Sequence, residues 1–350
     1  MKILYLYAEL MGYQIPILKE YVEQYNAEVH VVHWDNKKLT PYKPPILDNV
    51  IYYNRSEYNK DQLKELAKSI EPEIVYISGW QDRGYLAVSY NLRKKGIPVV
   101  TGFDDQWRGT LKQCLGAILF PYTLKSFYSH AWVAGPYQFE YASRMGFKKN
   151  EIIFNLLSGN TSLFNQGDYH LESKVNNYPK TFLYVGNFRH VKGTDILIKA
   201  FEIYREKYKG DWELTCVGNG EMLHLVKDKP KIEVIGFTAQ EDLIEIAKRS
   251  GVFILPSRVD QWGVVVHEFS SLGMPLILSE NVGAKALFLI ENFNGISFKN
   301  NSSENLAKAM NFISNKLDSE LIEMGLKSIQ LSRSISPSIS AANFVSINQS

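Results

Sequence analysis

The sequence predicts an α/β protein with two doubly wound domains, each a parallel sheet covered by helices on both faces. Short apolar segments alternate with amphipathic helical segments along the chain, which is typical of parallel sheets. A length of 350 residues exceeds the usual range of one domain, and 45% hydrophobic residues are ample for two packed cores.

The first half of the chain contains apolar segments that we interpret as strands. They are residues 1–10, 27–34, 49–54, 73–79, 97–104 and 130–135. Amphipathic segments at 15–25 and 60–70 are predicted helices between them. The loop after the first strand has one glycine, Gly12, and lacks the GxGxxG pattern of a dinucleotide site, which counts against a dehydrogenase.

The second half repeats the pattern at 181–201, 212–257 and 253–283. Between the halves, residues 161–180 lose periodicity and gain Asn, Gly and Pro. We therefore predict a first domain at 1–165, a second at 166–335, and a tail at 336–350 that returns to the first domain.

Composition narrows the class of protein. A net charge of +2 gives no signal for binding nucleic acid. The two cysteines, Cys114 and Cys216, lack metal-site spacing, and Cys216 lies in an apolar strand. The N-terminus lacks a cleavage site, and no apolar run approaches the roughly twenty residues of a membrane helix. We expect a cytoplasmic protein.

The segment 253–283 carries the strongest functional signal. It reads as a strand, a loop with Asp260 and Gly263, a helix with Glu268, and a second strand. Helix N-termini at the carboxyl ends of parallel strands bind phosphate, and Gly263 lets a ligand approach amides such as those of Val264 and Val265.

Carboxylates beside such a helix are suited to accepting hydrogen bonds from hydroxyl groups. Phosphate on the amides and hydroxyls on Asp260 and Glu268 together indicate a nucleotide sugar. The alternative is that Asp260 caps the helix and that Glu268 is solvated.

The run Asp260-QWGVVVH-Glu268 resembles the Glu-x7-Glu motif of retaining glycosyltransferases of the GT-B fold, family 4, or glycosyl transferases group 1. The resemblance covers nearly all the chain and is strongest over 181–298. It implies two Rossmann-like domains facing a cleft, with Asp260 on the donor sugar and Glu268 on the ribose. Asp260 replaces the usual first glutamate and reaches less far.

Residues 181–201 resemble the family's loop that holds the donor diphosphate. Lys192 matches its lysine, whereas Asn187, after Gly186, stands at the usual arginine position. Arg189 is then the candidate for the second cation. Two cations would stabilise the departing diphosphate, although solvated loop charges are the alternative.

Two further segments complete the implied site. The family's turn beside the nucleotide base is matched by Gly236 and Phe237, and Phe237 could equally be core. In the first domain, Gly12 falls in the family's glycine-bearing first loop, which approaches the donor phosphate. Asp104 and Asp105 could orient an acceptor hydroxyl, or Asp104 could cap the next helix.

No Asp-x-Asp sequence occurs, so we do not expect a metal to bridge the diphosphate. The nucleotide sugar would be a substrate, and we expect no cofactor. Residues 91–149 hold nine Lys or Arg and three acids, and 115–128 are apolar and aromatic. This face would suit a lipid-linked acceptor at an anionic membrane, or it is a solvated face above a buried helix. His267, inside the motif, is expected to be structural.

The resemblance implies a metal-independent, retaining hexosyltransferase. The favoured donor is a UDP-sugar, followed by a GDP-sugar. The enzyme would transfer the sugar to a glycan or lipid-linked glycan in bacterial surface polysaccharide or lipopolysaccharide synthesis. Two rival hypotheses remain, a GT-B nucleotide-sugar epimerase and a non-catalytic partner that only binds the nucleotide sugar.

Overall fold

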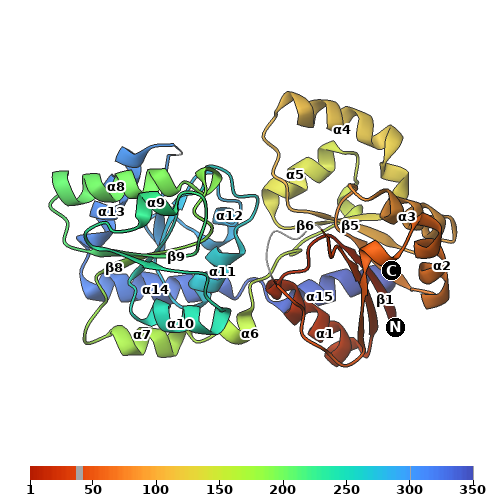
Figure 1. Ribbon diagram of the computed structural model, residues 1–350, viewed down its shortest axis with the longest axis horizontal. Coiled ribbons are helices and arrows are strands. Elements are labelled where there is room, and N and C mark those ends of the chain that lie inside the picture. The colour runs from red at the N-terminus through yellow and green to blue at the C-terminus, as the bar shows by residue number, and fades with distance from the viewer. Residues whose placement is uncertain (37–41, 300, 350) are drawn as a thin grey trace. The chain divides into compact units, whose positions relative to one another are not determined.

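The apolar segments form two parallel sheets, each in its own unit of the chain (Figure 1). The computed structural model describes every residue except 37–41, 300 and 350. The first unit comprises Met1–Asn160 with Ile335–Ser350, and the second comprises Thr161–Ser334. The sequence placed the division after residue 165 and the start of the tail at 336.

The first unit holds a seven-stranded sheet in the order β3-β2-β1-β4-β5-β6-β7. Ile3 pairs with Val29 on one side and with Ile74 on the other. Its strands are β1 Lys2–Tyr7, β2 Glu28–His33, β3 Val50–Asn54, β4 Ile74–Ile77, β5 Val99–Phe103, β6 His130–Val133 and β7 Ile152–Ile153. Its α-helices are α1 Ile15–Tyr25, α2 Lys60–Ile70, α3 Arg83–Lys94, α4 Leu111–Thr123, α5 Pro136–Arg144 and α15 Pro337–Val345.

The C-terminal helix α15 packs into the first unit beside α1. Its Phe344 is fully buried and lies 5.2 Å from the ring of Trp132 and 5.9 Å from that of Tyr5, measured between centroids. Burying an aromatic ring among other aromatic rings is a strong packing contribution. The last helix is therefore part of the core of the first unit.

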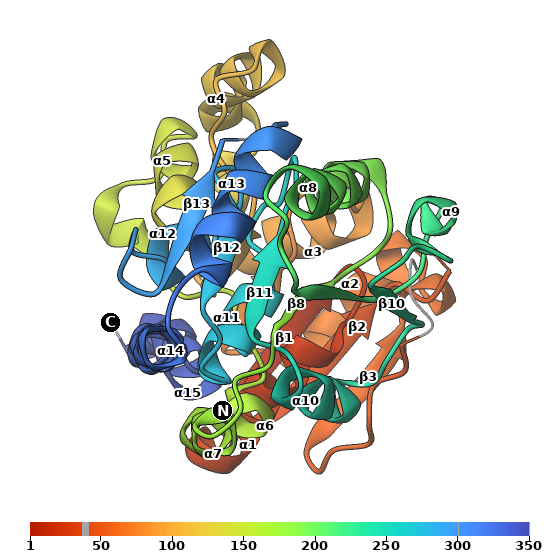
Figure 2. The same cartoon turned by 90° about the vertical axis from the view of Figure 1, so that its left-hand side faces the viewer.

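The second unit holds a six-stranded sheet in the order β10-β9-β8-β11-β12-β13. Helices α8 and α13 cover one face, and α10, α11 and α14 cover the other (Figure 2). Its strands are β8 Thr181–Val185, β9 Glu213–Val217, β10 Ile232–Ile235, β11 Val252–Leu255, β12 Leu276–Ser279 and β13 Gly295–Phe298. Its α-helices are α6 Thr161–Phe164, α7 Gly167–Lys174, α8 Thr194–Lys207, α9 Leu223–Val226, α10 Gln240–Lys248, α11 Val264–Ser271, α12 Lys285–Phe288, α13 Ser303–Ser314 and α14 Asp318–Ser332.

In both sheets the strand order reverses beside the first strand of the unit. The reversal lies between β1 and β4 in the first unit and between β8 and β11 in the second. Open parallel sheets bind ligands where the strand order reverses, outside the carboxyl ends of the strands. The prediction of two doubly wound α/β domains is confirmed, and each unit offers one such position.

Candidate active site

The two loops at the reversal point of the second unit are fixed to each other by close backbone contacts. They follow β8 and β11. Gly193 has a φ of 72°, and a Cβ there would lie 2.2 Å from the carbonyl oxygen of Pro256. The Arg258 amide donates to the Val191 carbonyl at 2.9 Å, so glycine at 193 lets the two loops meet.

The side chain of Arg258 ties the second loop to helix α8. Its guanidinium donates to both carboxylate oxygens of Asp195, at 2.6 and 2.7 Å. This bidentate pair is the strong form of a charge-assisted hydrogen bond, and it holds the pKa of Asp195 below its usual range. Arg258 is therefore a scaffold for the loop that carries Asp260.

Asp260 and Lys192 meet across these two loops. The Lys192 ammonium donates to Asp260 Oδ2 at 2.8 Å, and the Ser257 hydroxyl donates to the same oxygen at 3.1 Å. Asp260 is 7% exposed. Helix α11 starts after Gly263 without a side-chain cap, so the capping interpretation of Asp260 is wrong.

The first turn of α11 presents backbone amides at the same reversal point. Gly263 is left-handed, with a φ of 91°, and Val264 and Val265 form the first helical positions. The first four N–H groups of a helix have no partner within it, and they carry the positive end of the helix dipole. This end of α11 suits a phosphate group.

Glu268 lies one turn further along α11 and is buried. It is 4% exposed, and its Oε1 accepts a hydrogen bond from the Gln240 amide of α10 at 2.8 Å. The interpretation of Glu268 as a solvated charge is therefore wrong. The buried carboxylate is held in place by a neutral donor and remains able to accept from a hydroxyl.

The remaining predicted residues of the second unit lie on its loops. Tyr184 donates to the carbonyl of Asn187 at 3.0 Å, and the amide of Gly186 donates to Val217 at 3.0 Å. Arg189 is exposed, and within the described part of the chain its side chain has no hydrogen bond or ion pair. The structure thus pairs Lys192 with Asp260 and leaves Arg189 outside this pair.

The turn after β10 is open to solvent. No atom lies within 4 Å of the position that a Cβ on Gly236 would take, and Phe237 is 79% exposed. The interpretation of Phe237 as a core residue is wrong. An exposed aromatic ring is suited to stacking against a planar ligand.

His267 does not take part in this chemistry. It is buried, its ring stacks on Phe288 at 4.5 Å, and Nε2 donates to the Ser332 carbonyl at 2.9 Å. Burial lowers the pKa of His267 to about 4, so the ring is neutral near pH 7. Its contacts are those of a structural residue.

The first unit has a cavity of about 810 Å³ at its own reversal point, after β1, β4 and β5. Asp104 and Asp105 both line this cavity. Desolvation raises the pKa of Asp105 against the opposing influence of Arg108 and Lys112. Thr110 caps α4, so Asp104 does not.

Three tyrosines also belong to the lining of the cavity. Tyr7, Tyr13 and Tyr76 line it, and burial raises the pKa of each. A Cβ on Gly102 would lie 2.1 Å from the Tyr76 hydroxyl, so glycine makes room for that group. Gly12 lies between Met11 and Tyr13 in a 3-10 helix of this unit, whereas the other predicted donor residues lie in the second unit.

Sequence reasoning missed three groups that shape these sites. Ser257 and Gln240 hold the two carboxylates of the second unit, and Tyr76 lines the cavity of the first. Serine, glutamine and tyrosine are too common to stand out by themselves. For Ser257, its position three residues before Asp260 was the one available signal.

The described residues include neither a group of side chains that could bind a metal ion nor a helix that could cross a membrane. Among them, no group of three or more His, Cys, Asp or Glu side chains could hold a metal ion. Outside residues 37–41, 300 and 350, no helix is both long enough and apolar enough to cross a membrane. Independence from a metal stays a prediction.

A comparison with known protein families shows which family the second unit matches. The family model of glycosyl transferases group 1 matches residues 166–324, which include Lys192, Asp260 and Glu268. The second unit is a group 1 glycosyltransferase domain. The matching segment contains all the candidate groups described above for that unit.

Curated relatives agree with this assignment. A glycosyltransferase of Haemophilus influenzae is 29% identical over 175 residues, which are 48% of this chain and 47% of the relative. The glycosyltransferase MJ1178 of Methanocaldococcus jannaschii is 23% identical over 330 residues, 83% of this chain and 81% of the relative. The chain thus spans about half of the first relative and most of the second.

Solved structures of glycosyltransferases share the fold of this chain. A glycosyltransferase from Rickettsia africae has a TM-score of 0.75 at 15% identity and covers 99% of this chain and 97% of its own. Anabaena Alr3699/HepE in complex with UDP has a TM-score of 0.71 at 14% identity, with coverage of 100% and 98%. The GT-B fold expected from the motif is confirmed.

Proposed function

We propose that this group 1 glycosyltransferase moves a hexose from a nucleotide sugar to a glycan or lipid-linked glycan acceptor, with retention of configuration. The observation that supports the proposal is the Lys192–Asp260 pair beside the uncapped N-terminus of α11. A cation, free amides and buried carboxylates at one reversal point match the groups of a sugar diphosphate.

The catalytic contribution in this proposal is electrostatic. Negative charge grows on the diphosphate as the glycosidic bond breaks, and Lys192 with the first-turn amides of α11 stabilises it. Lys192 has three N–H groups and gives one to Asp260, so the others can donate to phosphate oxygens. Arg189, on the same loop, is proposed as the second cation.

The carboxylates serve the hydroxyl groups of the donor. Asp260 accepts from the sugar, and Glu268 accepts from the ribose. Gly186, Asn187, Gly236 and Phe237 complete the donor site, with Phe237 near the base. The retaining outcome follows the family resemblance of the motif, and we propose a reaction without metal or cofactor.

We propose UDP as the first choice of nucleotide and GDP as the second. Two solved structures of the same fold support UDP: HepE of Anabaena in complex with UDP-glucose, and an E. coli protein bound with UDP-2-fluoro glucose. The acceptor would occupy the cavity of the first unit, where Asp104 and Asp105 orient its hydroxyl. We place the enzyme in bacterial surface polysaccharide synthesis, at the cytoplasmic face of the membrane.

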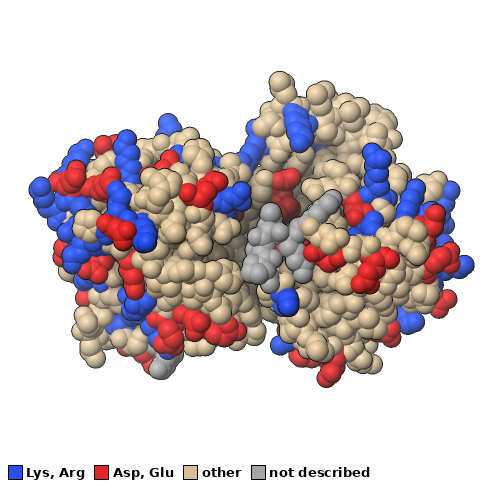
Figure 3. All heavy atoms as spheres, viewed as in Figure 1, with Lys and Arg blue, Asp and Glu red and all other residues tan. Residues whose placement is uncertain are grey.

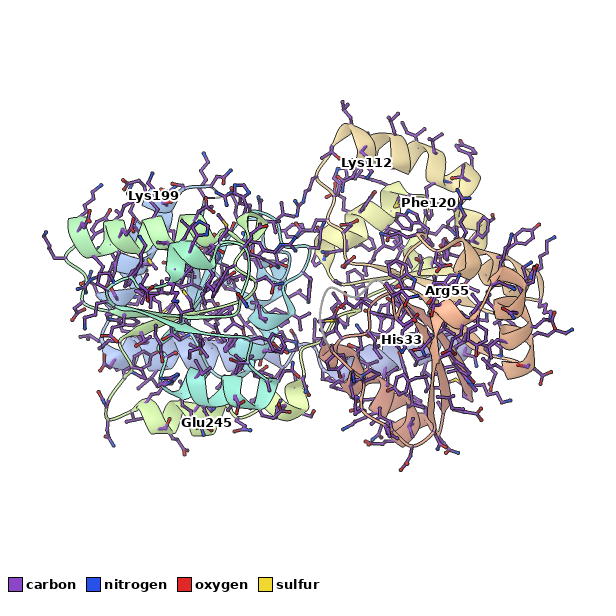
Figure 4. The ribbon with its side chains drawn as sticks, in the orientation of Figure 1. His33, Arg55, Lys112, Phe120, Lys199 and Glu245 are labelled. Atoms are coloured by element: carbon purple, nitrogen blue, oxygen red, sulfur yellow. The ribbon has the colours of Figure 1, made fainter. Side chains whose placement is uncertain are left out.

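A thermal-shift panel of UDP-, GDP-, ADP- and CMP-sugars tests the donor site. Ligand at about 100 times its Kd should stabilise the fold by about 2.7 kcal/mol, or roughly 5–10 °C. We expect this shift from a UDP-sugar in the wild type and a much smaller one in Glu268→Gln. Glu245→Gln is the matched control, because Glu245 is exposed on α10 (Figure 4).

A second assay tests turnover. Incubation of the stabilising donor with glycan acceptors should give a glycoside whose anomeric configuration, determined by NMR, matches that of the donor. Conversion of the donor sugar without any acceptor would indicate an epimerase. Binding without turnover of any acceptor would indicate a non-catalytic partner, and binding of no nucleotide sugar would contradict the donor site.

A further inference from the structure

The first unit has a second cavity, of about 480 Å³, at the carboxyl ends of β2, β3 and β4. This volume is within the range of small-molecule sites. We call it the second cavity, and the cavity that holds Asp104 and Asp105 the first cavity. Gln81, in the loop after β4, belongs to the lining of both, so the second cavity borders the proposed acceptor site. The described residues of its lining are Trp34, Arg55, Gln81, Asp82, Arg83 and Gly84.

Asp82 is the one carboxylate among these lining residues, and donors of the protein already occupy it. Its Oδ1 accepts from Arg55 Nη2 at 2.9 Å and from the amides of Gly84 and Tyr85 at 2.7 and 3.1 Å. Its Oδ2 accepts from Arg55 Nε at 2.9 Å and from Trp34 Nε1 at 3.3 Å. A carboxylate has about four lone-pair sites. Five donors therefore leave no acceptor for the hydroxyl group of a ligand.

The same bonds fix the guanidinium of Arg55. Its Nη1 donates to the Tyr58 carbonyl at 2.6 Å, and its side chain is 19% exposed. A Cβ on Gly84 would lie 2.4 Å from Nη2, so glycine lets the guanidinium approach the start of α3. A guanidinium has five N–H groups, and these three nitrogens each use one. Two N–H groups remain on a side chain that is held in place before any ligand binds.

Arg83 and Gln81 add donors that the fold does not use. Both are exposed, and within the described part of the chain neither side chain has a hydrogen bond or an ion pair. Arg83 is the first residue of α3, where the positive end of the helix dipole disfavours a cation. The helix itself therefore gives no reason for an arginine at this position.

The surroundings of the second cavity are not broadly basic. Asp35 follows β2 but is not part of the lining, and its carboxylate accepts from the amide and the hydroxyl of Ser56. Its charge offsets part of the local positive potential. On the face seen in Figure 3, acidic and basic side chains are interspersed over the part of the first unit that holds α2 and α3. Selection of a ligand must therefore rest on directed hydrogen bonds inside the cavity and not on net charge.

We propose that the second cavity binds an anionic group of the acceptor glycan, either the carboxylate of a uronic acid or a phosphate ester. A lining with unused guanidinium donors and an occupied carboxylate calls for a ligand that accepts hydrogen bonds, and guanidinium groups bind both kinds of oxyanion. The hydroxyl that receives the sugar lies in the first cavity. Because the two cavities share Gln81, one glycan can reach both. The role of this glycan as acceptor rests on the proposed function.

Titration calorimetry of the full chain without a donor tests the site. The probes are glucose, glucuronate, glucose 6-phosphate and inorganic phosphate. We expect one of the two anionic sugars to bind about tenfold more tightly than glucose, because a hydrogen bond to a charged group is the stronger one. The sugar that binds more tightly identifies the source of the anion. Equal affinity for glucose and both anionic sugars would overturn the proposal. Inorganic phosphate that binds as tightly as the sugars would also overturn it, because the cavity would then be a site for a free ion.

Arg83→Gln should weaken binding of the preferred anionic sugar about tenfold, to the level of glucose. Its melting temperature should match or slightly exceed that of the wild type, because the helix dipole disfavours the cation. Lys95→Gln is the matched control. Lys95 is exposed at the other end of α3 and outside the lining, so its loss should leave binding of the anionic sugar unchanged. Equal binding by the wild type and Arg83→Gln would contradict the assignment.

Binding of the anionic sugar and binding of the donor are separate readouts. Lys192, Asp260 and Glu268 lie in the second unit, so Arg83→Gln should keep the wild-type shift with a UDP-sugar. Binding of the anionic sugar without transfer to any glycan would fail the proposed function and leave the anion site standing. Transfer with equal kcat/KM to acidic and neutral forms of one disaccharide would overturn the inference and leave the proposed function intact.

Discussion

Replacing Lys192 with methionine separates the structural role of its ion pair from its proposed role in donor binding. Asp260 has a side chain only 9% exposed, while that of Lys192 is 31% exposed. Breaking a fully buried pair costs about 3–5 kcal/mol, and the partial exposure of Lys192 lowers this to about 2 kcal/mol. Lys192→Met should therefore melt about 4–8 °C below the wild type.

The double variant Lys192→Met with Asp260→Asn should recover most of this stability. Removal of both charges leaves no uncompensated carboxylate, and the side-chain carbonyl of the introduced asparagine can still accept from Ser257. Donor binding should not recover, because the cation for the diphosphate is still absent. Differential scanning fluorimetry with and without a UDP-sugar measures both quantities in one experiment.

Lys199→Met is the control for loss of a lysine, because Lys199 is exposed on α8 of the same unit (Figure 4). It should change neither the melting temperature nor the donor-induced shift. If the double variant regains the wild-type shift with donor, Lys192 does not hold the diphosphate. If Lys192→Met melts like the wild type, the pair contributes nothing to the fold.

Three further substitutions test the packing of the second unit. Gly193→Ala should destabilise it by about 2–5 kcal/mol, through the left-handed backbone and the clash with Pro256, while Gly236→Ala should be close to neutral in urea unfolding. The folded-state pKa of His267 lies below its ordinary 6.5, at about 4, so the unfolded chain binds the proton more readily between these values. The free energy of unfolding should fall by about 3 kcal/mol as the pH drops from 6.5 to about 4, and His267→Gln should remove most of this loss. If the variant keeps the pH profile of the wild type, His267 is not the cause of the loss.

The sequence predicted the elements of the fold well because their periodicity is local. The expected helices at 15–25 and 60–70 are α1 and α2, and the second strand expected in the segment 253–283 is β12. Helices α3 and α5 were not predicted. Helix α4 continues past Pro121 to Thr123, although proline has no N–H to donate to the carbonyl four residues earlier.

The candidate site was only partly predictable. The motif located Lys192, Asp260 and Glu268, but it did not reveal that Asp260 pairs with Lys192 or that Glu268 is held by Gln240. These partners are far apart in the chain. Lys192 and Asp260 meet because β8 and β11 are neighbours in the sheet, and Gln240 meets Glu268 between α10 and α11. Local patterns encode neither the strand order nor the helix packing.

The sequence by itself determined where strands, helices and the motif lie, because side-chain periodicity and turn residues act over a few neighbours. The tertiary structure alone decided which loops touch, which carboxylates are buried and which face of α4 stays open. Phe120 and Ile118 are both large and apolar, yet one is buried and the other exposed. Hydrophobicity favours burial for each, but only the packing of the first unit offers a partner to one of them.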